Sequence, residues 1–135
     1  AFKALPPFPV EISALICRHL VMSMMPALME GNLPLFGQAI QAIQGEIGRY
    51  FAPAQGGIFT SRSVEATIHR LAQAGATGVG QSSWGPTGFA FAGSQAQAEH
   101  IVDSVAPGPG TRIQIVAGRN TGAEITHSLL NLARA

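Results

Sequence analysis

Charge is scarce in this sequence, and several function classes lose support as a result. Asp, Glu, Lys and Arg make up 11% of the 135 residues, less than half of the roughly 25% usual for a globular domain. The eight basic residues are scattered, so no basic run indicates binding to nucleic acid or to an anionic membrane. Because so few charges leave little polar surface, we expect part of the surface to contact another domain or a second copy.

Lysine and cysteine are almost absent. Lys3 is the only lysine, which excludes a Walker A phosphate loop. Cys17 is the only cysteine; it excludes an internal disulfide, and we expect a reducing, cytoplasmic location. No Cys/His pair has zinc-ligand spacing, and no Gly-x-Ser-x-Gly elbow occurs. These absences leave the catalytic residues unknown and predict no metal site.

Long hydrophobic runs are also missing from the sequence. The most apolar stretch, Leu20–Met29, is short for a bilayer and contains Pro26. The amino end, Ala1–Pro9, is rich in proline and lacks the pattern of a secretory signal. We therefore expect no membrane segment, and we interpret residues 1–9 as an arm or linker.

Three helices are predicted in the first half of the chain. Apolar spacing predicts a helix over Val10–Glu30, kinked or ended early by Pro26. Asn32 is expected to cap a second helix, and Tyr50–Ile58 is expected to be irregular. The third helix begins near Arg62. The core stripe of the second helix is Phe36, Ile40, Ile43 and Ile47.

The second half predicts short strands and two more helices. Gly75 is placed to cap the third helix. It is followed by a short strand, a glycine loop, and a second strand over Thr87–Ala92. Ser94 opens one helix through a capping box and Thr121 opens the last, with a strand over Thr111–Val116 between them. We predict one α+β domain over residues 1–135, with a small, mostly antiparallel sheet and helices packed on one face.

Residues 78–86, Gly-Val-Gly-Gln-Ser-Ser-Trp-Gly-Pro, form the most informative motif. Glycines allow close approach to the backbone, and successive N–H groups in a turn can bind an anion. Hydroxyls and an amide add further hydrogen-bonding groups. The alternative interpretation is a tight structural turn between two strands. The candidate phosphate-binding residues are Gly78, Gly80, Gln81, Ser82, Ser83, Trp84 and Gly85.

Two other segments contain candidate binding residues. Arg49 opens a stretch of aromatic, amide and glycine residues, and its guanidinium could hold a phosphate or carboxylate. A second arginine lies where a strand is predicted to end and a capped helix to begin, a place suited to anions. In the alternative interpretation both arginines are simply solvated. The residues of these segments are Arg49, Gln55, Gly56, Gly57, Arg119 and Asn120.

Three segments together resemble the β-ribofuranosylaminobenzene 5′-phosphate synthases of the GHMP superfamily. They are Gly75–Thr87, Gly48–Gly57 and Arg119–Ala123, and Met25–Leu28 with Phe36-Gly37 also fits. The resemblance implies a GHMP C-terminal domain, ferredoxin-like in fold, that forms the C-terminal part of a chain about twice as long. It also implies an N-terminal domain with the other phosphate motif as partner, and a homodimer. The chain alone is then expected to be inactive.

The resemblance further implies a reaction in tetrahydromethanopterin biosynthesis. 4-Aminobenzoate, or a related benzoate, would condense with phosphoribosyl pyrophosphate and release CO2 and pyrophosphate. The glycine loop would bind phosphate, Gln55, Arg49, Arg119 and Asn120 would hold substrate, and Trp84 would wall the aromatic ring. Mg²⁺ would accompany the pyrophosphate, with no organic cofactor. Two alternatives stay open: a GHMP small-molecule kinase, and a non-catalytic binding or dimerisation module.

Overall fold

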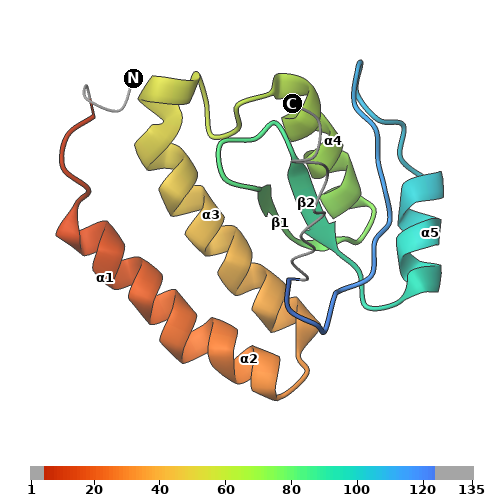
Figure 1. Ribbon diagram of the computed structural model, residues 1–135, viewed down its shortest axis with the longest axis horizontal. Helices are drawn as coiled ribbons and strands as arrows, with labels where there is room; N and C mark the ends of the chain where they lie inside the picture. The colour runs from red at the N-terminus through yellow and green to blue at the C-terminus, as the bar shows by residue number, and fades with distance from the viewer. Residues whose placement is uncertain (1–4, 124–135) are drawn as a thin grey trace, which may run out of the picture.

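The computed structural model describes residues 5–123, and Figure 1 shows how its elements are arranged. A helical run comes first, made of α1 (Val10–His19), the π-helical turn η2 (Leu20–Met24) and α2 (Met25–Met29). The remaining elements are α3 (Leu33–Gln55), α4 (Arg62–Gln73), β1 (Thr77–Gln81), β2 (Gly88–Phe91) and α5 (Gln95–Asp103). Helices and a small antiparallel sheet confirm the α+β class.

The first helical run is continuous, but its winding changes before Pro26. The widened turn η2 ends at Met24, and Pro26 lies at the start of α2. A proline ring crowds the carbonyl group four residues earlier and has no N–H to donate, so a local change of winding accommodates it. The prediction of a helix disturbed at Pro26 is confirmed in outline.

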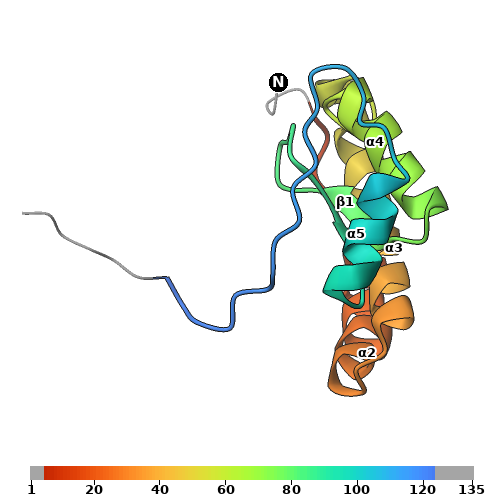
Figure 2. The ribbon, with the colours of Figure 1, turned by 90° about the vertical axis from the view of Figure 1, so that its right-hand side faces the viewer.

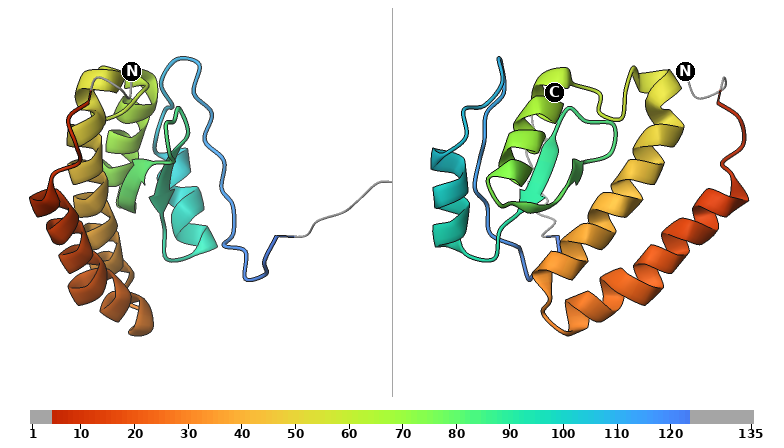
Figure 3. Two further views of the ribbon diagram at one scale, coloured as in Figure 1. Left: turned by 60° about the vertical axis from the view of Figure 1, so that its left-hand side comes forward. Right: turned by 180° about the vertical axis from the view of Figure 1, so that it is seen from behind.

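This helical run has nearly the predicted bounds, but most of it is exposed. Over Val10–Met29 its mean hydropathy is 1.5, and 6% of that window is buried. By length and composition it is the one helix in residues 5–123 apolar enough to cross a membrane, a test that core helices and signal sequences also pass. The expectation of no membrane segment was based on the shorter stretch Leu20–Met29, whereas the apolar helix spans 20 residues. Figure 3 shows the run beside α3, on the side of the molecule opposite α5.

The described part of the predicted arm, residues 5–9, contains no helix or strand and contacts α3. The Tyr50 hydroxyl donates a hydrogen bond to the carbonyl oxygen of Pro6 at 2.6 Å. The rings of Phe8 and Tyr50 meet edge to face, with centroids 4.6 Å apart. These contacts attach the segment to α3, whereas residues 1–4 lie outside the described residues.

Helix α3 begins as predicted and ends later than predicted. The Asn32 side chain accepts a hydrogen bond from the N–H of Leu35 at 3.1 Å, so it is the expected cap. The prediction of an irregular Tyr50–Ile58 is wrong, because the helix continues to Gln55 with Pro53 inside it. Pro53 falls in the last turn, where only one helical hydrogen bond is lost before Gly56 ends the helix with φ +85°.

Helix α4 and the two strands lie close to where the local sequence signals predict them. Ser61 caps α4 through a 3.3 Å bond from the N–H of Val64, and Gly75 follows its end with φ +103°. The strands pair antiparallel, with Gly80 opposite Phe89. Helix α3 packs against β1 and α4 packs against β2.

The carboxyl-terminal part of the described chain departs from the prediction. Ser94 caps α5 as expected, through a 3.1 Å bond from the N–H of Gln97. The predicted strand Thr111–Val116 does not form: no neighbouring strand in residues 5–123 pairs with it, and only Ile113 of this segment packs on the core of Leu71, Ile101 and Val105. Figure 2 shows this blue part of the trace leaving the body of the molecule. The final predicted helix lies largely outside the described residues.

Candidate functional site

A pocket of about 500 Å³ lies between α3, the segment that follows it, and the end of β1. Its lining combines flat rings with side-chain amides, and it includes no carboxylate among the described residues. Arg49 and His69 are its ionisable members. The amides are those of Gln41, Gln44, Gln55 and Gln81, and the aromatic rings are those of Phe51, Phe59 and Trp84.

Glycines allow the segment after α3, which forms one wall of the pocket, to lie close to that helix. At Gly48 an added Cβ would lie 2.5 Å from Cγ2 of Ile58 and 3.0 Å from its carbonyl oxygen, so the chain folds back tightly against the helix. The left-handed conformation of Gly56 makes this reversal possible. The Gln55 amide then donates to the Ile58 carbonyl oxygen at 2.8 Å and fixes the turn. Gly56 and Gly57 thus shape the wall, although they are not themselves part of the lining.

Aromatic rings form the opposite side of the pocket. Trp84, in the loop between β1 and β2, meets Phe51 of α3 edge to face with ring centroids 4.9 Å apart. Phe51 in turn contacts Tyr50, at 4.8 Å. Trp84 keeps 36% of its surface exposed. A row of rings that includes a partly exposed tryptophan suits a planar aromatic ligand.

Three backbone amides of the expected phosphate cradle are occupied by hydrogen bonds within the chain. Gly78–Gln81 belong to strand β1 rather than to a loop. The N–H of Gln81 donates to Oε1 of Gln44 at 3.1 Å, that of Ser82 to the carbonyl of Thr87 at 2.9 Å, and that of Gly85 to the carbonyl of Ser82 at 2.9 Å. These three amides are therefore occupied within the chain, which corrects the expectation that they face an oxyanion.

The glycines of this motif have a packing role instead. An added Cβ at Gly80 would lie 2.6 Å from Cζ of Phe89 and 2.7 Å from Cγ of Gln44. At Gly78, φ is +59° and the Cβ would lie 2.9 Å from Cα of Gly37 in α3. At Gly78 the backbone of α3 leaves no space for a Cβ, and at Gly80 the side chains of Gln44 and Phe89 would have to shift to admit one.

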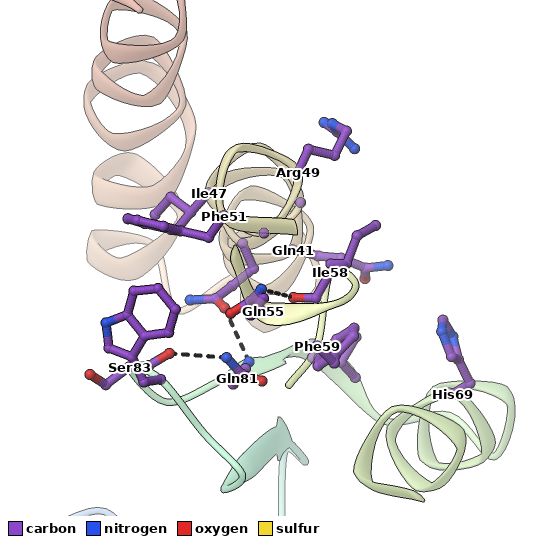
Figure 4. A pocket seen from close by; sticks show the side chains of 15 residues that line it. Gln41, Ile47, Arg49, Phe51, Gln55, Ile58, Phe59, His69, Gln81 and Ser83 are labelled. Atoms are coloured by element: carbon purple, nitrogen blue, oxygen red, sulfur yellow. Dashed lines mark hydrogen bonds between the residues drawn. The ribbon is translucent and has the colours of Figure 1, made fainter. Parts of the chain in front are cut away.

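The other candidate residues are divided between the pocket and the surface. Figure 4 shows Gln55, Gln81 and Ser83 near one another, while Arg49 points away from them. Arg49 forms an ion pair with Glu46, and 56% of its side chain is exposed. Ser83 lines the pocket with φ +51°, and Ser82 is not part of the lining.

Arg119 and Asn120 are not brought to the pocket by the described structure. The Arg119 Nε donates to Oγ1 of Thr121 at 3.0 Å, a contact within its own segment. Neither residue belongs to the lining. Within residues 5–123, no three His, Cys, Asp or Glu side chains gather where they could hold a metal ion.

Sequence reasoning missed the amides that α3 contributes. Gln41 and Gln44 are three residues apart on one face of α3, in a stretch otherwise made mainly of apolar residues and glycine. This spacing could have identified them. Phe59 and Thr60 had no comparable signal, because their position depends on the fold of the segment after α3.

The comparisons with known proteins agree with this fold. The family model of the GHMP kinases C terminal matches residues 24–109. The chain is 31% identical over 125 residues to the beta-ribofuranosylphenol 5′-phosphate synthase of Methanothermobacter thermautotrophicus, an alignment that covers 90% of this chain and 36% of the relative. The chain thus spans about a third of that relative's length. No solved structure matches. The chain belongs to the family of GHMP kinase C-terminal domains.

Proposed function

We propose that this chain forms the aromatic-substrate side of a synthase that joins a benzoate to the ribose of phosphoribosyl pyrophosphate. The observation that carries the proposal is the pocket lined by rings and carboxamides, with no carboxylate among its described lining residues. The relative's printed name describes a synthase of a ribofuranosylphenol phosphate, which is a ring attached to a sugar phosphate. The pocket supplies the surface that such a ring needs.

The rings of the pocket would hold the benzoate by its flat face and edge. Trp84 and Phe51 already form an aromatic pair, and a third ring could extend it. Each such contact contributes about 0.5–1.5 kcal/mol beyond the burial of apolar area. The absence of a carboxylate in the described lining favours an anionic ligand, because no like charge would repel it.

The carboxamides of the pocket divide into donors and acceptors. Oε1 of Gln44 accepts from the N–H of Gln81, which directs the Gln44 NH2 group to other partners. The NH2 group of Gln55 donates to Ile58, which leaves its carbonyl oxygen as an acceptor. A donor and an acceptor on one wall match a benzoate that carries a carboxylate and a 4-amino or 4-hydroxyl group.

In the proposed reaction, one ring carbon loses its bond to the carboxylate carbon and gains a bond to C1 of the ribose. A bond forms between that carbon and C1 of the ribose, while the C1–oxygen bond breaks and its electron pair leaves with pyrophosphate. The ring–carboxylate bond then breaks, CO2 leaves, and its electron pair restores the aromatic ring. The chain's part is to hold the ring carbon facing C1, and such orientation alone can supply several kcal/mol of the barrier.

Phosphoribosyl pyrophosphate and its Mg²⁺ would be held mainly by another part of the active protein. The backbone amides of Gln81, Ser82 and Gly85 are occupied. Arg49, the arginine of the lining, points outward in Figure 4 and is paired with Glu46. We therefore propose that a second domain, as in a longer relative of which this chain covers 36%, completes the site. The same proposal includes the tetrahydromethanopterin pathway and a cytoplasmic location.

A kinase is the second candidate, because the matching family is described as GHMP kinases. A kinase would need open donors for nucleotide phosphates, and the occupied amides of Gln81, Ser82 and Gly85 argue against them here. Pyrophosphate release in the complete protein distinguishes the two. Release that depends on 4-aminobenzoate and phosphoribosyl pyrophosphate supports the synthase, and ATP turnover without it supports the kinase.

A pair of charge-changing variants tests the pocket itself. Gln44→Glu keeps an oxygen for the Gln81 N–H, but it replaces the NH2 donor with a negative charge. We expect the KM for benzoate to rise about tenfold or more, from one lost hydrogen bond and like-charge repulsion. The control Gln114→Glu makes the same change at an exposed glutamine outside the lining. Equal benzoate KM values for both variants would contradict the proposed ring site.

A further inference from the structure

Thr60, between α3 and α4, connects two walls of the pocket although it is not part of the lining. Its N–H donates to Oε1 of Gln81 at 2.7 Å. Its hydroxyl oxygen lies 2.9 Å from the same Oε1 and 2.8 Å from the carbonyl oxygen of Trp84. One threonine thus contacts both the last residue of β1 and the loop that contains the tryptophan.

These contacts fix which way the Gln81 carboxamide faces. A backbone N–H can only donate, so the side of the amide next to Thr60 must be its oxygen. The NH2 group then faces the other way, where it donates to the carbonyl oxygen of Ser83 at 3.1 Å. Gln81 is 8% exposed, and hydrogen bonds shielded from water are stronger than exposed ones.

The Thr60 hydroxyl has one proton and two acceptors within reach. It can donate to Gln81 or to Trp84, or share its proton between them, and each arrangement holds the loop next to the segment after α3. The link reaches Trp84 directly through its carbonyl group and indirectly through Gln81 and Ser83. Two independent connections therefore restrain the backbone that carries the indole ring.

Gly85 shows that the loop is built around this pair. Its φ is +64°, and an added Cβ would lie 2.8 Å from Oε1 of Gln81 and 3.0 Å from Oγ1 of Thr60. The backbone therefore passes so near the two side chains that glycine fits best. A glycine that the motif first suggested as a phosphate ligand serves the Thr60–Gln81 contact instead.

We propose that Thr60 and Gln81 are positioning residues that hold Trp84 in the pocket wall and thereby set the affinity for the aromatic substrate. This inference rests on the proposed function for its substrate, but not for its geometry. Thr60 acts through Trp84 and not through the ligand. Loosening the pair should weaken benzoate binding and leave the affinity for phosphoribosyl pyrophosphate unchanged.

The test compares Thr60→Val, which removes the hydroxyl and keeps the N–H, with Thr60→Ser, which keeps both. Trp84 is the only tryptophan, so the fluorescence of the chain reports its environment without ligand. We expect Thr60→Val to increase acrylamide quenching of Trp84. In the complete protein its benzoate KM should rise roughly tenfold, as for the loss of one buried hydrogen bond. Thr60→Ser should stay within about twofold of wild type in both measurements.

Gln81→Glu provides a second variant with its own control. It keeps an acceptor for Thr60 but turns a carboxylate oxygen toward the Ser83 carbonyl, so we expect the same increase in quenching; Gln114→Glu should show none. Wild-type quenching in both Thr60→Val and Gln81→Glu, with wild-type circular dichroism, would overturn the proposal. A wild-type protein that does not bind benzoate would refute the proposed function alone, because the quenching measurement needs no ligand.

Discussion

Gly80→Ala distinguishes a glycine required for packing from one required for a ligand. In the structure the new Cβ would lie 2.6 Å from Cζ of Phe89 and 2.7 Å from Cγ of Gln44, whereas ordinary contacts lie at 3.4–4 Å. The φ of Gly80 is not in the left-handed region. The backbone therefore accepts alanine, and the expected effect comes from the overlap alone.

The magnitude follows from two opposing contributions. Overpacking a tight contact costs about 1–3 kcal/mol, while replacing glycine by alanine in a strand stabilises by about 0.5–1 kcal/mol. The net loss of stability is then about 0–2.5 kcal/mol, and its midpoint, near 1 kcal/mol, corresponds to a fall in Tm of roughly 3–5 °C for a chain of this size. Gly78→Ala should cost more, because it adds a left-handed φ of +59° to its overlap with Phe91.

Thermal and urea unfolding of the chain measure this effect, with Gly118→Ala as the matched control. Gly118 has nothing within 4 Å of an added Cβ, and its φ is not positive. We expect its Tm to stay within about 2 °C of wild type. If Gly80→Ala kept the wild-type Tm but lost benzoate binding, the glycine would serve close approach of a ligand, and the packing argument would be refuted.

Three further predictions concern the tryptophan, a helix cap and the exposed helical run. Trp84→Ala should raise the Kd for 4-aminobenzoate roughly tenfold and Trp84→Phe only severalfold, because phenylalanine keeps an aromatic partner. Calorimetric titration measures both Kd values, and a Trp84→Ala variant with the wild-type Kd would contradict the ring site. Asn32→Ala should destabilise the chain by about 1 kcal/mol through loss of the cap on α3, measured by urea unfolding, and no change would remove the cap's role. Met22→Gln with Met29→Gln should change the free energy of unfolding by less than about 0.5 kcal/mol, because both side chains are exposed; a larger loss would show that they are buried.

Local signals in the sequence predicted most element boundaries. Asn32 and Ser94 act as caps because a side-chain oxygen reaches an N–H three residues later, a contact within one turn. The sequence does not predict the end of α3, because a proline such as Pro53 more often interrupts a helix than continues it. Its position in the last turn makes it compatible with a helix.

The candidate site could not be predicted from local patterns, because contacts between distant parts of the chain form it. Gly80 pairs with Phe89 of β2 and lies close to Gln44 of α3, and no local pattern in the sequence shows either neighbour. Gln44 and Gln81 meet across 37 positions of sequence, which periodicity cannot show. The predicted strand Thr111–Val116 failed for the same kind of reason, since an alternating pattern needs a neighbour to pair with, and residues 5–123 provide none.

The most direct measurement of the central claim is a ¹H–¹⁵N spectrum of the chain during titration with 4-aminobenzoate. One tryptophan gives one indole N–H signal. The account predicts that this signal shifts in a saturable way, together with the side-chain amide signals of Gln44 and Gln55. An indole signal and amide signals that stay fixed up to millimolar ligand would contradict an aromatic-acid site in this pocket.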